Sequence, residues 1–172
     1  MPTASIPAKQ TPEVLLQAAA LLSQWELARP AGSAPLTPEL RTAFMQYAAE
    51  ILSDSQETNL YIADLQEVLR GAIGLAIGRA EASGSGRAMG ALATAYQNMQ
   101  TIEPHNASHG RIMLSIQSRP DAEIEMAEWT EITEALLRNT GQNWELIFGY
   151  GVLPTLPSEI RLTILLAPFI YT

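Results

Sequence analysis

Residues 143–169, "NWELIFGYGVLPTLPSEIRLTILLAPF", hold two apolar runs that are separated by a short segment with two prolines. The runs at 143–152 and 159–169 predict strands, and the prolines predict a connection because proline cannot donate to a sheet ladder. The part "LTILLA" is apolar on both faces of its strand. We therefore expect a sheet that is covered on each side.

Upstream of these strands, the hydrophobic period alternates between that of a helix and that of a strand. The expected elements are strands at 72–80 and 110–118 and helices at 37–54, 60–71, 86–99 and 121–141. The order from residue 37 is helix, helix, strand, helix, strand, helix, strand, strand. This order predicts a two- or three-layer α+β domain over residues 37–172.

Residues 1–36 are expected to form an N-terminal extension with one amphipathic helix and a linker. The string "TPE" at 11–13 supplies an N-cap, a proline at the first helical position and an acidic first turn, which predicts a helix over 12–28. The apolar face of this helix carries Val14, Leu15, Leu22 and Trp25. The following "RPAGSAP" has prolines and a glycine that cannot continue the helix.

At 172 residues, with 47% hydrophobic residues and a net charge of −8, the chain has the composition of one globular domain. Lys9 is the only lysine and the other cations are scattered arginines, so we expect neither a nucleic-acid nor a membrane partner. The absence of cysteine excludes disulfides and thiolate chemistry. The N-terminus lacks the apolar region of a signal peptide, and we expect a cytoplasmic protein.

A glycine-rich loop at 83–86 precedes the helix expected at 86–99, an arrangement that many proteins use to hold a phosphate. Gly84, Gly86 and Gly90 give the spacing G-x-G-x-x-x-G, which is one residue longer than the dinucleotide fingerprint, and no Gly-Lys-Ser/Thr follows. The spacing therefore fits neither phosphate-binding loop, and we expect no cofactor.

Several of these strings resemble the C-terminal domain of FtsZ, the bacterial cell-division GTPase that is related to tubulin. The family's Phe-Gly and Glu-x-Arg-x-Thr are matched by Phe148, Gly149, Glu159, Arg161 and Thr163. The string "GRAEASGSGRA" at 78–88 is similar to the family's G-x-A-x-G-x-x-R-A, which joins a strand to a sheet-covering helix, so the resemblance implies that the glycine-rich loop is a connection. The resemblance covers residues 38–170 and implies an FtsZ/tubulin C-terminal-domain-like fold, with a mixed sheet of about four strands, two covering helices and additional N-terminal helices.

The resemblance also bears on catalysis. Segment 51–69 is similar to the end of the family's central helix and the loop after it, where Asn-x-Asp-x-x-Asp helps to hydrolyse GTP on the next subunit of a filament. Asn59 and Asp64 match and form a candidate remnant of that GTPase-activating loop, but Tyr61 replaces the first acid. Alternatively, Asn59 and Asp64 are a loop turn and a helix cap. No glycine-rich GTP-binding loop precedes residue 38, so we expect the GTP-binding domain to be absent and the chain not to be an enzyme.

These features and the resemblance predict a non-enzymatic domain that acts by protein–protein contact. The partner is either a second copy, giving a dimer, or a filament-forming cell-division GTPase such as FtsZ. The candidate interaction surface is the apolar face of the N-terminal helix, formed by Val14, Leu15, Leu22 and Trp25. This helix either folds back as a lid on the face that the family buries against its GTPase domain, or docks on a partner.

A domain of another class is the alternative, one that binds a small molecule or catalyses a reaction in a pocket between the helices and the sheet. Such a pocket is expected near Arg87, His105 or His109. A metal ion at the two histidines would need a third ligand such as Glu103. Because solvated loop histidines are much commoner than metal ligands, no metal is expected.

Overall fold

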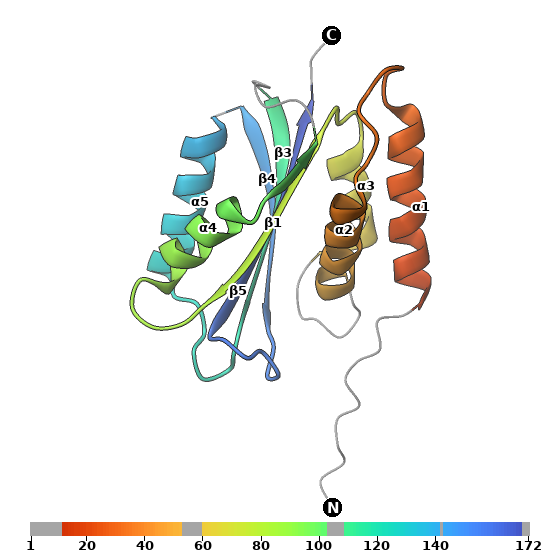
Figure 1. The fold of residues 1–172 in the computed structure, drawn as a ribbon. Helices are drawn as coiled ribbons and strands as arrows, with labels where there is room; N and C mark the ends of the chain where they lie inside the picture. Colours follow the sequence, from red (N-terminus) through yellow and green to blue (C-terminus); the bar gives the residue numbers. More distant parts are fainter. Residues whose placement is uncertain (1–11, 53–59, 103–108, 142, 170–172) are drawn as a thin grey trace, which may run out of the picture.

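The computed structural model describes residues 12–52, 60–102, 109–141 and 143–169, which form five helices and a mixed five-stranded sheet. The helices are α1 (Pro12–Ala28), α2 (Pro38–Ile51), α3 (Ile62–Leu69), α4 (Arg87–Gln97) and α5 (Met126–Thr140). The strands are β1 (Leu75–Ala82), β2 (Gln100–Ile102), β3 (His109–Ser118), β4 (Trp144–Val152) and β5 (Ile160–Phe169). This architecture confirms the expected α+β class (Figure 1).

The strands lie in the order β2-β1-β5-β3-β4, so β5 occupies the centre of the sheet. β5 runs antiparallel to both β1 and β3, whereas β3 and β4 are parallel and are joined through α5. The sheet has one strand more than the four expected. The additional strand is β2, which has three residues and pairs with β1 at the edge. Three residues are too few to give a strand pattern in the sequence.

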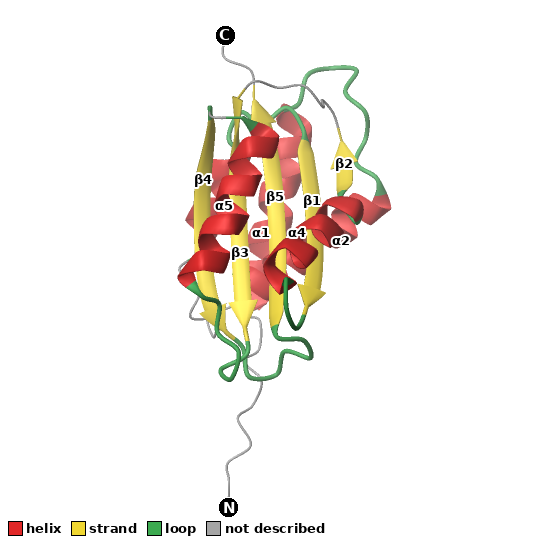
Figure 2. Ribbon diagram, turned by 90° about the vertical axis from the view of Figure 1, so that its left-hand side faces the viewer, coloured by secondary structure: helices red, strands yellow, loops and turns green. Residues whose placement is uncertain are grey.

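Helices cover both faces of the sheet, as the two-sided apolar character of β5 predicted. α4 and α5 lie on one face, α2 and α3 lie on the other, and α1 packs outside α2 and α3 (Figures 1 and 2). Successive residues of β5 contribute to the two cores, because Ile164 packs on the α4 and α5 side and Leu165 on the α2 and α3 side. Both side chains are fully buried. The molecule therefore has four layers.

Local hydrogen bonds fix where the helices begin. The Thr37 hydroxyl accepts a hydrogen bond of 3.1 Å from the Leu40 N–H, which caps α2 as its sequence predicts. α5 begins at Met126, five residues after the expected start at 121. The carboxylate of Glu128 accepts a bond of 2.9 Å from the Glu125 N–H, and this capping interaction sets the start of the helix.

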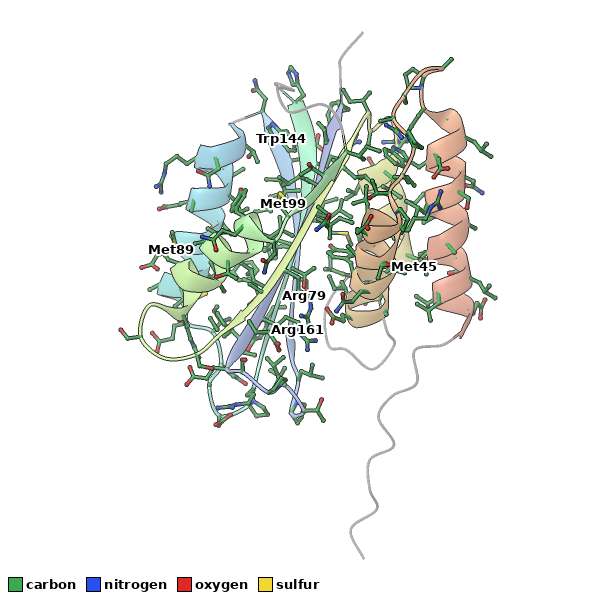
Figure 3. All side chains as sticks on the ribbon, in the orientation of Figure 1. Met45, Arg79, Met89, Met99, Trp144 and Arg161 are labelled. Carbon is green, nitrogen blue, oxygen red and sulfur yellow. The ribbon has the colours of Figure 1, made fainter. Side chains whose placement is uncertain are left out.

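Gly78 in β1 marks a close approach between α4 and the sheet. A Cβ on Gly78 would lie 2.3 Å from the carbonyl oxygen of Ala95, a buried residue of α4. Met99, beyond the end of α4, lies on the same side of the sheet (Figure 3). β1 and α4 can therefore be this close only because residue 78 lacks a side chain.

Gly78→Ala is expected to push α4 away from β1 and to lower the free energy of unfolding by about 1–3 kcal/mol, as overpacking does. Gly90→Ala is the matched control, because Gly90 lies on the exposed side of α4 with no atom within 4 Å of an added Cβ. Alanine there should stabilise the helix by about 0.5–1 kcal/mol. Urea denaturation followed by circular dichroism measures both, and equal stability of Gly78→Ala and wild type would contradict the close packing.

Candidate functional site

Helix α1 packs one face against α2 and α3. Leu22 and Trp25, which were predicted for this face, are 3% and 6% exposed. The indole Nε1–H of Trp25 donates a hydrogen bond of 2.7 Å to the carbonyl of Ala72, between α3 and β1. Val14 and Leu15, the other two residues of the predicted face, are half-buried. The face thus joins the core that α2 and α3 share with the sheet.

The opposite face of α1 is turned to solvent and carries two large apolar side chains. Leu16 is 71% exposed and Leu27 is 86% exposed. No helix of the described ranges has both the length and the apolar character that a membrane crossing needs. These leucines are isolated positions on an otherwise polar face, which is ordinary for a surface helix.

A groove of about 480 Å³ runs between α1 and the end of α3. Its walls include Leu21, Trp25, Arg29 and Leu69. The Arg29 guanidinium lies 4.9 Å from the centroid of the Trp25 ring, and its Nη1 donates to the Ala34 carbonyl at 2.5 Å. The Nε and Nη2 of Arg29 are buried with no hydrogen-bond partner among the described residues. The groove therefore combines apolar walls with a cationic end.

Arg87, at the start of α4, joins three segments that are distant in sequence. Its Nε and Nη2 donate to the carboxylate of Glu128 at 2.8 and 3.0 Å, and its Nη1 donates to Glu159 at 2.9 Å. The carbonyls of Ala122 and Glu123 accept the remaining bonds at 2.9 and 3.0 Å. All the guanidinium nitrogens are thus engaged within the protein. The hydrogen bond to Glu128 raises the pKa of Arg87 and lowers the pKa of Glu128.

The glycine-rich loop connects β1 to α4, as predicted. Gly84 and Gly86 have φ angles of 81° and 71°, a left-handed conformation that glycine adopts at little cost. The Gly84 N–H donates to the Glu159 carboxylate at 3.2 Å, and the Glu159 N–H donates to the Ser83 hydroxyl at 3.0 Å. The Gly84 N–H, from which a bound phosphate would accept a hydrogen bond, therefore already donates to a carboxylate of the protein.

Asp64 lies in the first turn of α3. Its carboxylate accepts a hydrogen bond of 2.7 Å from the Tyr61 N–H, the geometry of a helix cap. Tyr61, which replaces the first acid of the resembled motif, is 65% exposed. Asn59, the other candidate remnant of a GTPase-activating loop, lies outside the described residues.

The residues of the alternative pocket do not come together around a space in the described part of the chain. Arg87 is saturated by protein groups, and His105 and Glu103 lie outside the described residues. His109 begins β3 and stacks against Phe169 of β5, with 6.3 Å between the ring centroids. Within the described ranges, no three His, Cys, Asp or Glu side chains are placed to hold a metal ion.

A charged cluster that the sequence reasoning missed lies between α2 and the sheet (Figure 3). The Glu50 carboxylate accepts a hydrogen bond of 2.8 Å from Arg79 Nε and lies 3.7 Å from Arg161 Nη1. The Nη2 of Arg161 pairs with Glu81 at 3.4 Å. The side chains of Glu50 and Arg161 are 15% and 12% exposed. Charged residues that interrupt the apolar strands β1 and β5 were the signal in the sequence.

A polar cavity of about 210 Å³ opens beside this cluster, between α2 and the sheet. It is lined by Ala43, Gln46, Tyr47, Ile77, Arg79, Asn98, Gln100 and Thr163. Tyr47 is 1% exposed, and its hydroxyl has no hydrogen-bond partner among the described residues. Burial raises the pKa of Tyr47 well above its ordinary value, so this lining group is neutral.

Phe148 of β4 belongs to an exposed group of apolar side chains at the edge of the sheet. Its ring is 53% exposed and meets Trp129 of α5 edge-to-face, with 4.9 Å between centroids. Met126, at the start of α5, is 77% exposed. We call Met126, Trp129 and Phe148 the apolar strip. On the other face of β4, Leu60 packs against Gly149, and a Cβ there would lie 2.5 Å from Leu60 Cγ.

The fold is similar to that of solved FtsZ and CetZ structures and matches the FtsZ/tubulin C-terminal domain fold. An empty FtsZ dimer from M. jannaschii aligns with a TM-score of 0.54 at 17% identity, and an FtsZ mutant of that organism with 0.55 at 18%. CetZ from Methanosaeta thermophila strain DSM 6194 aligns with 0.53 at 20%.

The similarity extends over most of this chain but over less than half of the solved proteins. The three alignments cover 80%, 81% and 77% of this chain, and 41%, 43% and 38% of the FtsZ, mutant FtsZ and CetZ chains. No protein-family model and no curated protein matches the sequence. The likeness is therefore one of fold, and it agrees with the partial FtsZ/tubulin resemblance.

Proposed function

We propose that this chain is a non-enzymatic, FtsZ/tubulin C-terminal-like domain that acts in the cytoplasm by protein–protein contact, with a second copy or with a filament-forming cell-division GTPase. The observation that carries the proposal is a contrast among the described side chains. The best-buried charged groups, such as Arg87 and Arg161, are bonded to other groups of the protein. Met126 and Phe148 of the apolar strip, in contrast, are 77% and 53% exposed.

The dimeric state of one structural neighbour supports protein contact as the proposed role of this chain. One neighbour is an FtsZ dimer, and this chain spans 41% of that protein's chain. A fold alone does not fix a function. A domain of this fold in which all the guanidinium nitrogens of Arg87 are bonded to protein groups nevertheless offers surfaces for docking more readily than groups for catalysis at that place.

Co-sedimentation with FtsZ of the same organism tests the proposal. We expect the chain in the pellet when GTP drives FtsZ to polymerise and in the supernatant when GDP replaces GTP. Sedimentation velocity of the chain alone tests self-association in the same buffer. A chain that stays in the supernatant and is monomeric would remove both partners and refute the proposal.

In the same assay, replacing Asp64 distinguishes a role in protein contact from a role in GTP hydrolysis by FtsZ. Asp64→Ala is expected to co-pellet like wild type and to leave GTP turnover by FtsZ unchanged, because the carboxylate caps α3. Its free energy of unfolding should fall by about 1 kcal/mol, the usual effect of losing a cap. If the wild-type chain accelerates GTP turnover and Asp64→Ala does not, the chain acts in catalysis and the proposal is wrong.

The polar cavity beside α2 favours a second candidate function, the binding of a small molecule between the helices and the sheet. The buried Tyr47 hydroxyl has no partner among the described residues and is a group that a small polar ligand would satisfy; the Arg79 guanidinium, paired with Glu50, lines the same cavity. A thermal-shift screen of small polar metabolites tests this function. A rise in Tm that is lost in Thr163→Val would support binding in this cavity, and no rise with any compound would reject it.

A further inference from the structure

β4 is an edge strand of nine residues with one unpaired side. It pairs with β3 on its inner side, and among the described residues no strand pairs with its outer side. Figure 2 shows β4 at one edge, with α5 running along it. The opposite edge of the sheet is different, because β2 has only three residues there. A short edge strand limits pairing with another chain, whereas a long one offers a row of free N–H and C=O groups.

Within its own sequence, β4 lacks the proline, lysine and bulge by which many proteins protect an edge strand. Its sequence, "WELIFGYGV", contains no proline and no lysine, and its register with β3 is continuous from Trp144 to Val152, without a bulge. Glu145 is its only charged residue, and the stretch 146–152 is uncharged. A nearly uncharged edge of this length, with which no described strand pairs, is either an aggregation hazard or a pairing site.

The side of α5 next to this edge is also uncharged. From Trp129, which contacts Phe148, helical spacing places Met126, Thr130, Thr133 and Leu137 along the same side. The exposed acids Glu131 and Glu134 fall on the outer side of the helix. In a chain with a net charge of −8, the edge of β4 and this side of α5 together form a neutral surface. We call it the edge surface.

We propose that the edge surface binds the same surface of a second copy, with the two β4 strands antiparallel about a two-fold axis at Phe148. This proposal rests on the self-association that is part of the proposed function. Phe148 is the middle residue of the nine in β4, so the two strands align along their full length. The remaining residues then pair as Trp144 with Val152, Glu145 with Gly151, Leu146 with Tyr150, and Ile147 with Gly149.

The charge distribution of the edge surface favours a second copy of this chain as its partner. In this register each Glu145 faces a glycine, so no two like charges are opposite each other across the strands. The two α5 helices meet through their uncharged sides, and the apolar strips of both copies become adjacent. A two-fold interface of this kind uses the same patch on both subunits and closes after two copies. Because each copy carries −8, added salt should tighten the dimer by screening the remaining repulsion.

Sedimentation velocity over a range of protein concentrations tests the proposal. We expect a reversible dimer of wild type whose Kd rises roughly thirtyfold or more in Phe148→Glu, the effect of losing a central interface residue. Thr130→Arg, on the exposed side of α5, should act in the same direction. Leu27→Glu is the matched control, because Leu27 is 86% exposed on α1, and it should dimerise like wild type.

The absence of cysteine allows a direct test of register. A single Phe148→Cys faces its own copy across the two-fold axis, within the reach of a disulfide, so mild oxidation should give a cross-linked dimer. Leu27→Cys should remain monomeric on a non-reducing gel. A dimer that persists in Phe148→Glu, or that cross-links through residue 27, would overturn the proposal.

Comparing dimerisation with co-sedimentation distinguishes pairing through β4 from the proposed role in protein contact. A wild-type chain that is monomeric at the highest concentrations but co-pellets with FtsZ polymer would refute pairing through β4 and keep the role in protein contact. A chain that dimerises through residue 148 but does not co-pellet would support the pairing and leave self-association as the function.

Discussion

A chain without residues 1–30 is expected to aggregate, because α1 covers the outer surface of α2 and α3. The deletion removes Ala18, Leu22 and Trp25 from the core that these helices share with the sheet. At about 25 cal/mol per Å², uncovering even ~500 Å² of apolar surface costs on the order of 10 kcal/mol before chain entropy is considered. That is comparable to the whole stability of an ordinary domain.

Point substitutions in α1 separate packing from other effects of the deletion. Trp25→Ala should lower the free energy of unfolding by about 3–5 kcal/mol, as expected when a buried aromatic residue is removed. Trp25→Phe keeps most of the apolar volume but loses the bond to the Ala72 carbonyl, so it should cost about 1–3 kcal/mol. Leu16→Ala is the control on the same helix, and because Leu16 is 71% exposed it should change stability by less than about 0.5 kcal/mol.

Urea denaturation measures these differences, and light scattering detects aggregation of the deletion variant. The hypothesis that α1 serves as a lid would fail if the shortened chain were a monomer as stable as wild type. α1 would then be available to a partner, which is the other role considered for it.

Replacing Arg87 by methionine is expected to lower the free energy of unfolding by about 3–5 kcal/mol, the cost of removing one member of a buried ion pair. The Arg87 side chain is 10% exposed, and its loss leaves Glu128 and Glu159 without their cation. Arg87→Lys should recover little, since an ammonium group cannot donate to five acceptors in one plane. Arg119→Met is the matched control, because the Arg119–Asp121 pair is far more exposed and should contribute less than about 1 kcal/mol.

The pH dependence of the stability difference between wild type and Arg87→Met tests whether the ion pair with Glu128 causes it. The pKa of Glu128 is lowered from its ordinary value of 4.5 in the folded protein, mainly by the hydrogen bond from Arg87. Its charged form therefore stabilises the fold above that value, and the contribution is lost as the pH falls through the lowered pKa. The stability gap between wild type and Arg87→Met should be complete at neutral pH and narrow below about pH 4.5. If the stability difference between wild type and Arg87→Met does not change with pH, lost packing of the Arg87 side chain causes the destabilisation.

Local patterns in the sequence predicted most of the fold. The start signal at 11–13 and the apolar face of the helix at 12–28 depend on neighbouring residues, which a sequence displays directly. The strand β2 could not be predicted, because its three residues form a strand only through pairing with β1. The start of α5 at Met126 was also missed, because it depends on which acidic side chain accepts the hydrogen bond from the Glu125 N–H.

The site could be predicted only where it depends on one element. Leu22 and Trp25 follow from the period of a single helix. The cluster of Glu50, Arg79 and Arg161 joins an α-helix and two strands, and its formation requires knowledge of the strand order. Arg161 stands at a position that the FtsZ resemblance matches, but the resemblance does not name its partners. The edge surface likewise follows from the position of β4 at the end of the sheet.

The central place of β5 has a consequence for how this protein is made. β1 and β2 form one half of the sheet and β3 and β4 the other, and β5 is the only described strand bonded to both halves. A ribosome completes Ile160–Phe169 after the other described strands. Until that segment leaves the exit tunnel, the nascent polypeptide holds two unjoined pieces, β1–α4–β2 and β3–α5–β4, whose apolar strands β5 does not yet bridge. Completion of the sheet must therefore follow translation of this segment, and the two pieces stay unjoined until then.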